Sequence, residues 1–300
     1  MKFSIIIPAF NSSKYIEKCL DSVFQLNYHK KKYEIIVIDG GSKDNTIKMV
    51  KKYDAIKLYI RKMNISAARN FGAFKSKGKN LVFIDSDCVI NKNLLIKAEK
   101  NLMKYNCCGA FYKADKNAGW VAKTWLLIEG KKKGLVDWVP SGTLIVKKST
   151  FNEINGFDEK LETQEDFDFC YRLGKKGYRI YNDSSLSSVH LGQTDNLMDF
   201  FKKEIWRGKG LIEGIKRHGI LLNELPSTVL NFFYLILILS SIVFLIFNRI
   251  FLIIWLGLFI IPSSILALRK AIIVKNLKYS LNFFVLMLLY QLARAASLLF

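Results

Sequence analysis

Hydrophobic residues in the first part of the chain fall into short continuous runs, separated by segments in which they recur at helical spacing. The runs have the length expected of strands buried on both faces. They lie at residues 3–8, 34–39, 55–60 and 81–84. Residues 14–25 and 46–53, between these runs, are predicted to form helices. This alternation predicts an α/β, Rossmann-like fold with a mostly parallel sheet, in which ligands bind beyond the carboxyl ends of the strands.

The pattern changes after Pro226, where the chain becomes almost continuously apolar. Val229–Phe247 and Ile250–Leu268 each contain 19 predominantly apolar residues. That length is enough to cross about 30 Å of hydrocarbon. Because only Asn248 and Arg249 separate the two segments, we expect an antiparallel transmembrane hairpin.

A third apolar segment, Leu281–Phe300, contains Gln291 and Arg294. A charge at the centre of a membrane-spanning helix costs about 2.5–3.5 kcal/mol, but Arg294 lies near the end of the segment and its side chain can reach the interface. The segment is therefore expected either to cross the membrane or to lie in the interface as an amphipathic helix.

Composition adds a strong positive charge, with 46 Lys and Arg residues against 25 Asp and Glu residues. Six of the basic residues and none of the acidic ones follow Pro226. The balance is compatible with nucleic acid, an anionic membrane surface or phosphorylated substrates, and the apolar tail favours the membrane. The sequence has no nucleic-acid recognition motif, nucleophile elbow or zinc-spaced cluster, which argues against a nucleic-acid partner and against a hydrolase.

The basic residues around the predicted spans are unevenly distributed. Four lie between residues 269 and 280, against Arg249 alone in the hairpin turn. The positive-inside rule therefore predicts a multi-pass protein of the cell membrane whose N-terminal domain is cytoplasmic. Five cysteines without a Cys-x-x-Cys pair indicate free thiols in a reducing compartment, in agreement with that side.

Two carboxylates follow the buried run 81–84, in the sequence Asp85-Ser86-Asp87. At positions i and i+2 of an extended chain their side chains point the same way, and they repel one another unless a cation intervenes. Mg²⁺ typically takes one or two carboxylates together with phosphate oxygens. The motif therefore indicates a metal and diphosphate site, although Asp and Ser are also common in an ordinary turn.

Four segments in order resemble family 2 of the inverting glycosyltransferases, which has the GT-A fold. They are Ser4–Asn11, Ile38–Thr46, Ala68–Gly72 and Asp85–Asp87, and the similarity of order and spacing extends over roughly the first 210 residues. One departure is Gly40, which stands where that family usually has a second aspartate in the glycine-rich loop.

The resemblance implies how a nucleotide-diphospho-sugar would bind. Asp39 would read the base, Arg69 would help to hold the nucleotide, Asp85 would contact the ribose or donor sugar, and Asp87 would bind Mg²⁺ or Mn²⁺. The other residues implied in nucleotide-sugar binding are Pro8, Ala9, Phe10, Asn11, Gly41, Ser42 and Ser86. Without the resemblance, Arg69 is also compatible with a solvated charge on a helix that Ser66 caps.

Glu165 and Asp166 stand at the start of another predicted helix. Acidic residues in a first helical turn are stabilised by the helix dipole whatever their function. By the resemblance, Asp166 is the catalytic base and Glu165 is its supporting neighbour or an acceptor ligand. Such a base is needed because a sugar hydroxyl is a weak nucleophile, and a positioned carboxylate contributes about 10²–10⁴-fold.

Two further residues have alternative interpretations. His190 either is a partly buried histidine with ordinary partners or completes the metal shell, as a histidine at this place does in some relatives of the family. Arg207 belongs to a basic amphipathic segment, 200–210, that either offsets charge on the departing diphosphate or lies on anionic lipid.

The sequence therefore predicts a GT-A domain at 1–222 and a membrane anchor of two to three helices at 223–300. The expected activity is transfer of a sugar to a lipid-linked or cell-surface glycan, in a metal-assisted single displacement. A polyprenyl-phosphate sugar synthase and a non-catalytic nucleotide-sugar binding module are the alternatives.

Overall fold

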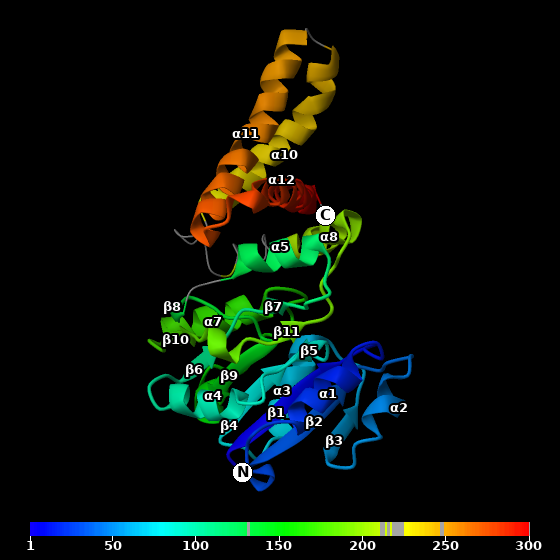
Figure 1. Cartoon of the computed structure of the whole chain (residues 1–300), viewed down its shortest axis with the longest axis vertical. Helices are drawn as coiled ribbons and strands as arrows, with labels where there is room; N and C mark the ends of the chain where they lie inside the picture. Colours follow the sequence, from blue (N-terminus) through cyan, green and yellow to red (C-terminus); the bar gives the residue numbers. More distant parts are fainter. Residues whose placement is uncertain (131–132, 211–213, 215–216, 218–224, 247–248, 300) are drawn as a thin grey trace. The chain divides into compact units, whose positions relative to one another are not determined.

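The computed structural model describes residues 1–130, 133–210, 214, 217, 225–246 and 249–299. The chain divides into two compact units (Figure 1). Unit 1 contains residues 1–116 and 130–193, and unit 2 contains residues 117–129 and 194–300. The domain boundary expected at residue 222 lies outside the described residues.

Unit 1 is built on an eight-stranded sheet with the order β3-β2-β1-β4-β9-β6-β10-β8. Its strands are β1 (Phe3–Ala9), β2 (Tyr33–Asp39), β3 (Ile56–Ile60), β4 (Asn80–Ile84), β6 (Cys107–Gly109), β8 (Gly134–Val136), β9 (Thr143–Lys147) and β10 (Ile180–Asn182). The neighbours β3, β2, β1 and β4 run parallel, whereas β9 is antiparallel to both β4 and β6. The expected α/β fold with a mainly parallel sheet is confirmed.

Helices cover both faces of this sheet. They are α1 (Ile16–Phe24), α2 (Thr46–Val50), α3 (Ile65–Lys75), α4 (Leu94–Leu102), α6 (Lys148–Glu153) and α7 (Glu165–Lys175). Side chains alternate along a strand, so Ile5 packs in one core cluster with Leu20 of α1, and Ile6 packs in the other with Phe169 of α7. Burial on both faces explains the unbroken apolar runs of the central strands.

Helix α3 begins differently from the sequence expectation. Its N-cap is Asn64, whose side-chain oxygen accepts a hydrogen bond of 2.9 Å from the backbone N–H of Ala67. Ser66, the predicted cap, is already inside the first turn and is buried. Asn64 has extended backbone geometry, as a cap requires, so the helix starts two residues earlier than predicted.

A second, three-stranded sheet holds residues from three distant parts of the chain. It has the order β5 (Cys88–Val89), β11 (Val189–His190) and β7 (Lys113–Ala114). Strand β11 pairs antiparallel with β5, with His190 opposite Cys88. This pairing carries His190 to the end of the Asp85–Asp87 segment.

Unit 2 is helical. Its main helices are α5 (Trp120–Glu129), α8 (Leu197–Gly208), α10 (Leu225–Ile246), α11 (Arg249–Val274) and α12 (Ser280–Ala296). A core cluster joins α5, α8, α11 and α12. Among the described residues, 253–274 and 277–299 are long and apolar enough to cross a membrane, and 226–241 is a shorter apolar stretch.

Candidate functional site

The first group of predicted residues lies where β1 and β2 end. Asp39 is fully buried, and one of its carboxylate oxygens accepts backbone N–H hydrogen bonds from Gly41 at 2.9 Å and Ser42 at 2.7 Å. The Ser42 hydroxyl donates to the other oxygen at 2.7 Å and accepts from the N–H of Asn11 at 2.8 Å. Gly41 has a φ of +95°, which suits glycine, and lets the loop fold back over the carboxylate.

The strand residues Pro8 and Ala9 contribute through the backbone. Both are buried within β1, opposite Ile38 and Asp39, and the carbonyl of Ala9 accepts from the N–H of Gly40 at 2.8 Å. Phe10, by contrast, is 61% exposed. Its ring is therefore available to a ligand at this edge of the sheet.

Arg69 forms the centre of a second group. The side chain is only 1% exposed, and its guanidinium donates to Asp85 and to Glu165, each at 2.7 Å. Burial opposes the positive charge, but the two carboxylates raise the pKa of Arg69 above its usual value. The alternative of a solvated helix charge is therefore wrong, because the guanidinium is enclosed and paired with acids from two distant segments.

Asp85 has a further partner that the sequence did not indicate. Its second carboxylate oxygen accepts from the hydroxyl of Tyr112 at 3.0 Å, and the same hydroxyl accepts from the N–H of Gly142 at 3.1 Å. Burial, together with nearby carboxylates such as Asp85, raises the pKa of Tyr112 well above its usual value. The phenol therefore stays protonated and acts as a donor to Asp85.

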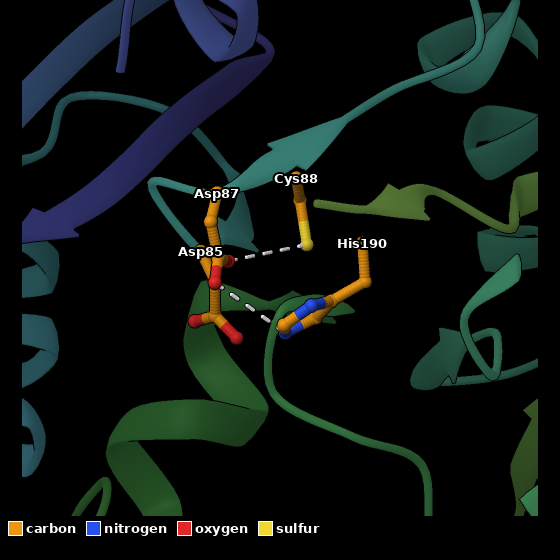
Figure 2. Close-up of side chains that lie close together, drawn as sticks. All are labelled: Asp85, Asp87, Cys88 and His190. Atoms are coloured by element: carbon orange, nitrogen blue, oxygen red, sulfur yellow. Dashed lines mark hydrogen bonds and ion pairs between the residues drawn. The ribbon is translucent and has the colours of Figure 1, made fainter. Parts of the chain in front are cut away.

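Asp85, Asp87, Cys88 and His190 form a compact group of possible metal ligands, drawn in Figure 2. Their ligand atoms all lie within 4.8 Å of one another, and Nε2 of His190 is 3.6 Å from a carboxylate oxygen of Asp87. The Cys88 thiol donates to the other Asp87 oxygen at 3.9 Å. Carboxylate and imidazole ligands at this spacing fit a divalent cation such as Mn²⁺.

The backbone around the two aspartates is a turn rather than an extended strand. Strand β4 ends at Ile84, and the N–H of Cys88 donates to the carbonyl of Asp85 at 3.0 Å. The expectation of an extended chain at this motif is therefore wrong, although carboxylate oxygens of the two aspartates still lie within 4.8 Å of one another. The turn directs Asp85 toward Arg69 and Tyr112, and it directs Asp87 toward His190.

Ser86 lies between them and connects this turn to the first loop. Its hydroxyl is 2.7 Å from that of Ser12, whose backbone N–H donates to Thr46 at 2.7 Å. The structure thus brings the glycine-rich loop, the loop after β1 and the Asp85–Asp87 turn into one connected edge of the sheet.

Glu165 and Asp166 begin α7. Gln164, the residue before the helix, has a φ of +63°, a left-handed geometry that is uncommon for glutamine and turns the chain sharply into the helix. Glu165 accepts from Arg69, and Asp166 accepts from the N–H groups of Ser141 at 3.3 Å and Phe167 at 2.8 Å. Burial and the neighbouring Glu165 raise the pKa of Asp166 to about 7, against the opposing effect of Arg69.

The predicted residues thus fall into linked groups, with one exception. Arg207 lies in unit 2, where it pairs with Glu204 at 2.7 Å and with Glu129 at 3.6 Å. The residues that sequence reasoning missed are Tyr112, Ser141, Gly142 and Cys88. The sequence Pro140-Ser141-Gly142, a turn signal before β9, is the local pattern that could have pointed to Ser141 and Gly142.

Comparison with known proteins gives one family match. Residues 4–172 match the model of glycosyl transferase family 2. The chain is 28% identical over 240 residues to a dolichyl N-acetyl-alpha-D-glucosaminyl phosphate 3-beta-D-2,3-diacetamido-2,3-dideoxy-beta-D-glucuronosyltransferase of Methanococcus voltae. That match covers 70% of this chain and 73% of the relative.

Two other relatives match over shorter stretches. Glycosyltransferase AglE of Haloferax volcanii is 40% identical over 91 residues, which is 28% of this chain and 30% of that protein. The poly(ribitol-phosphate) beta-N-acetylglucosaminyltransferase TarS of Staphylococcus aureus is 35% identical over 101 residues, or 32% of this chain and 18% of TarS. These two alignments therefore span less than a third of either relative.

Solved structures show the same fold. The mannosyltransferase PcManGT of Pyrobaculum calidifontis, in complex with GDP-Man and Mn²⁺, superposes with a TM-score of 0.66 at 18% identity, covering 100% of this chain and 87% of that one. TarS residues 1–349 of S. aureus, in complex with UDP, give a TM-score of 0.52 at 19% identity, covering 98% and 90%. The fold is therefore GT-A, and because the family match includes more than half of its residues, the chain belongs to glycosyl transferase family 2.

Proposed function

We propose that the chain is a metal-dependent, inverting glycosyltransferase. It transfers a sugar from a nucleotide-diphospho-sugar to a lipid-linked or polymeric glycan, and α10 and α11 anchor it in a membrane. The observation that carries this proposal is the double ion pair of Arg69, which ties Asp85 of the donor-binding edge to Glu165, the neighbour of Asp166.

The donor would lie along the carboxyl ends of β1, β2 and β4. Asp39, held in place by Ser42 and the loop N–H groups, would face the base, and Phe10 would offer an exposed ring beside it. Asp85 would contact the ribose or the sugar while Arg69 and Tyr112 fix its orientation. Hydrogen bonds of this kind hold a side chain in the rotamer that the ligand needs.

Asp87 and His190 would hold Mg²⁺ or Mn²⁺, with Asp85 close enough to contribute. A divalent cation bound there supplies charge stabilisation for the two phosphates of the leaving group. Mn²⁺ is present in the structure of PcManGT, which supports a divalent cation in the present chain.

Asp166 would act as the base. It takes the proton from the acceptor hydroxyl, the acceptor oxygen forms a bond to the anomeric carbon, and the bond from that carbon to the phosphate oxygen breaks. The electron pair of the broken bond leaves with the nucleoside diphosphate. One displacement of this kind inverts the anomeric centre. A pKa near 7 suits a group that must accept a proton near neutral pH.

The acceptor is proposed to be lipid-linked. The relative that matches over most of its length, from M. voltae, is named for a dolichyl phosphate-linked acceptor. The apolar helices of unit 2 would hold the protein at the surface where such an acceptor resides. TarS, which matches over a shorter stretch, is named for a poly(ribitol-phosphate) acceptor. A glycan polymer is therefore the second class of acceptor that we consider.

The test is a screen of radiolabelled UDP- and GDP-sugars with Mn²⁺, using the full chain in membranes that contain endogenous lipid-linked acceptors. We expect one donor to give a larger lipid-extractable product, with a mass increase of one sugar residue and an inverted anomeric linkage. Transfer into an insoluble polymer instead would favour the polymer class. Donor binding without any transfer would support a non-catalytic binding module and contradict the proposal.

A further inference from the structure

Helix α12 has the composition of a membrane span, but part of its surface packs against helices that carry charged residues. Residues 277–299 are apolar enough to cross a bilayer. Within unit 2, however, α12 packs against α5 and α8 as well as against the apolar helices α10 and α11. Helix α8 is rich in charged residues, and α5, although mainly apolar, contains Lys123 and Glu129. The location of α12 therefore depends on whether these two helices can enter hydrocarbon.

An ion pair attaches the end of α12 to α8. Glu204 of α8 is fully buried and accepts from Arg294 of α12 at 3.0 Å and from Arg207 at 2.7 Å. Arg207 is also 3.6 Å from Glu129 of α5. Arg207 and Arg294 are thus both paired with acidic side chains inside the layer.

The contact between α8 and α12 extends along α12. Phe283 and Leu286, near its start, share a core cluster with Trp125 of α5 and Phe200 of α8. The rings of Trp125 and Tyr290 lie 5.4 Å apart. At the far end, a Cβ on Gly208 of α8 would overlap the hydroxyl of Ser297, which shows that the two backbones approach closely there.

The partners of α12 are unsuited to hydrocarbon. Helix α8 carries Asp199 and Lys202 on its exposed side, the exposed Lys209 follows it directly, and α5 exposes Lys123. Charged side chains that face lipid at depth are strongly unfavourable, so α5 and α8 belong in water or headgroups. The contacts of α12 with α5 and α8 extend from Phe283 to Ser297. Insertion of α12 into the centre of the bilayer would break these contacts and the ion pair between Arg294 and Glu204.

Helices α10 and α11 have 22 and 26 residues and rise about 33 and 39 Å, enough to cross the roughly 30 Å of a hydrocarbon core. Residues 277–299 are also long enough. The feature that distinguishes α12 is therefore the charged group on its packed face, Arg294, which pairs with Glu204.

We infer that α12 lies along the membrane surface, on top of α5 and α8, and that only α10 and α11 cross. The layer formed by α5, α8 and α12 would contact the headgroup zone of an anionic bilayer. Basic residues Lys275 and Lys278 precede α12, Lys278 lies 5.5 Å from the ring centroid of Tyr279, and no acidic residue follows Pro226. The inference rests on the membrane anchoring in the proposed function and is independent of the transfer reaction.

Cysteine labelling tests this inference, because all five native cysteines are buried. Lys278→Cys and Leu299→Cys each add one exposed thiol, the first before α12 and the second after it. Lys104→Cys adds an exposed thiol to unit 1 and reports the side of the membrane on which unit 1 lies. The full chain in inverted membrane vesicles is treated with an impermeant maleimide before and after detergent. We expect all three variants to label to the same extent before detergent.

Two outcomes would contradict the inference, and they differ in what they imply for membrane anchoring. If Leu299→Cys labels from the opposite face, or only after detergent while Lys278→Cys and Lys104→Cys label before it, α12 is inserted and the inference is wrong. If alkaline carbonate instead releases the whole protein from the vesicles, the membrane anchoring fails first, and the inference falls with it while the transferase proposal stands.

The ion pair is tested by variants of Arg294 in the same assay. Arg294→Leu should reduce the labelling of the Leu299→Cys variant before detergent by at least twofold, because the uncharged helix is freed to enter the bilayer. Arg294→Lys keeps the charge and should label like the parent. Arg269→Leu, which removes an exposed arginine of α11, is the matched control. Unchanged labelling in Arg294→Leu would contradict the role given to the pair.

Discussion

A single buried guanidinium organises the candidate site at the scale of individual residues. Arg69 bonds to Asp85, 16 positions away, and to Glu165, 96 positions away, and the guanidinium carbon lies 5.5 Å from the ring centroid of Phe157. Because the side chain is 1% exposed, its removal would leave Asp85 and Glu165 facing a polar cavity without their cation. The two carboxylates would then repel one another in a partly buried environment.

Replacement of Arg69 should therefore destabilise unit 1. Arg69→Ala is expected to lower the free energy of unfolding by about 3 kcal/mol, the lower part of the range for a broken buried pair, since Asp85 keeps 22% exposure. Urea titration in detergent, followed by tryptophan fluorescence, measures it. Arg61→Ala, at an exposed arginine near Phe71, is the control and should change stability by less than about 0.5 kcal/mol. Equal effects of the two variants would contradict the role of Arg69.

Asp166 should give opposite pH trends in activity and in stability. Its pKa rises from 3.8 to about 7 on folding. Between these values the folded state holds more protons than the unfolded state, so its contribution to stability is present below pH 3.8 and is lost as pH rises through about 7. As a base it must be unprotonated, so kcat/KM should rise over the same interval and level off above it.

The measurement is a pair of pH profiles, one of kcat/KM and one of the urea midpoint. Asp166→Asn should remove the contribution of this residue to the stability slope. A kcat/KM profile that is flat between pH 5 and 8 would rule out Asp166 as the titrating base.

At the scale of elements, the two-residue strands β5 and β11 do much of the positioning. They hold His190 opposite Cys88, and the N–H of Leu191 donates to the carbonyl of Asp87 at 2.8 Å. Gly192 comes next, and a Cβ there would overlap a carboxylate oxygen of Asp87. The backbone therefore lies directly against one of the proposed metal ligands.

A methyl group at position 192 should displace that carboxylate. Gly192→Ala is expected to weaken Mn²⁺ binding by about 10–100-fold, as for other changes beside a metal ligand. Calorimetric titration with Mn²⁺ measures this without turnover. Gly174→Ala in α7, where a Cβ meets nothing within 4 Å, is the matched control and should bind Mn²⁺ like the parent. Undiminished binding in Gly192→Ala would count against Asp87 as a ligand.

Prediction from sequence succeeded for elements whose apolar pattern is unambiguous and failed where contacts are made between distant segments. Strands β1, β2 and β4 were predicted because burial on both faces leaves an uninterrupted apolar run. The Asp85–Asp87 turn was wrongly predicted to be extended, because Asp and Ser are common both at strand ends and in turns. Tyr112 reaches Asp85 from 27 positions away, a contact that no local periodicity encodes.

At the scale of the whole molecule, the chain passes from unit 1 into unit 2 and back. Residues 117–129 leave unit 1, form α5 within unit 2, and return at residue 130. Helix α5 buries Val121 and Trp125 against other helices of unit 2. Composition could not show this, because α5 is a ten-residue apolar helix that would suit either unit.

Because residues 117–129 belong to unit 2, unit 1 can be produced alone only if this segment is replaced. Removal of all residues after Gln193 should give an aggregating protein, since Val121, Trp125 and Ile128 lose their cover. Replacing residues 117–129 with a Gly/Ser linker in the same truncated chain should restore a monomer. Size-exclusion chromatography with light scattering measures both. A monomeric truncation that retains α5 would show that the helix does not depend on the rest of unit 2.

The central claim is that one inverting transferase site contains two groups of residues. Asp87 and His190 form the proposed metal-binding group, and Glu165 and Asp166 form the group that contains the proposed base. The most direct measurement compares single-turnover sugar transfer and donor binding in Asp166→Asn and in Glu162→Gln, an exposed acid just before α7. We predict that Asp166→Asn transfers about 10²–10⁴-fold more slowly while it binds the donor and Mn²⁺ normally, and that Glu162→Gln matches the parent. Transfer at the parental rate by Asp166→Asn would contradict the claim.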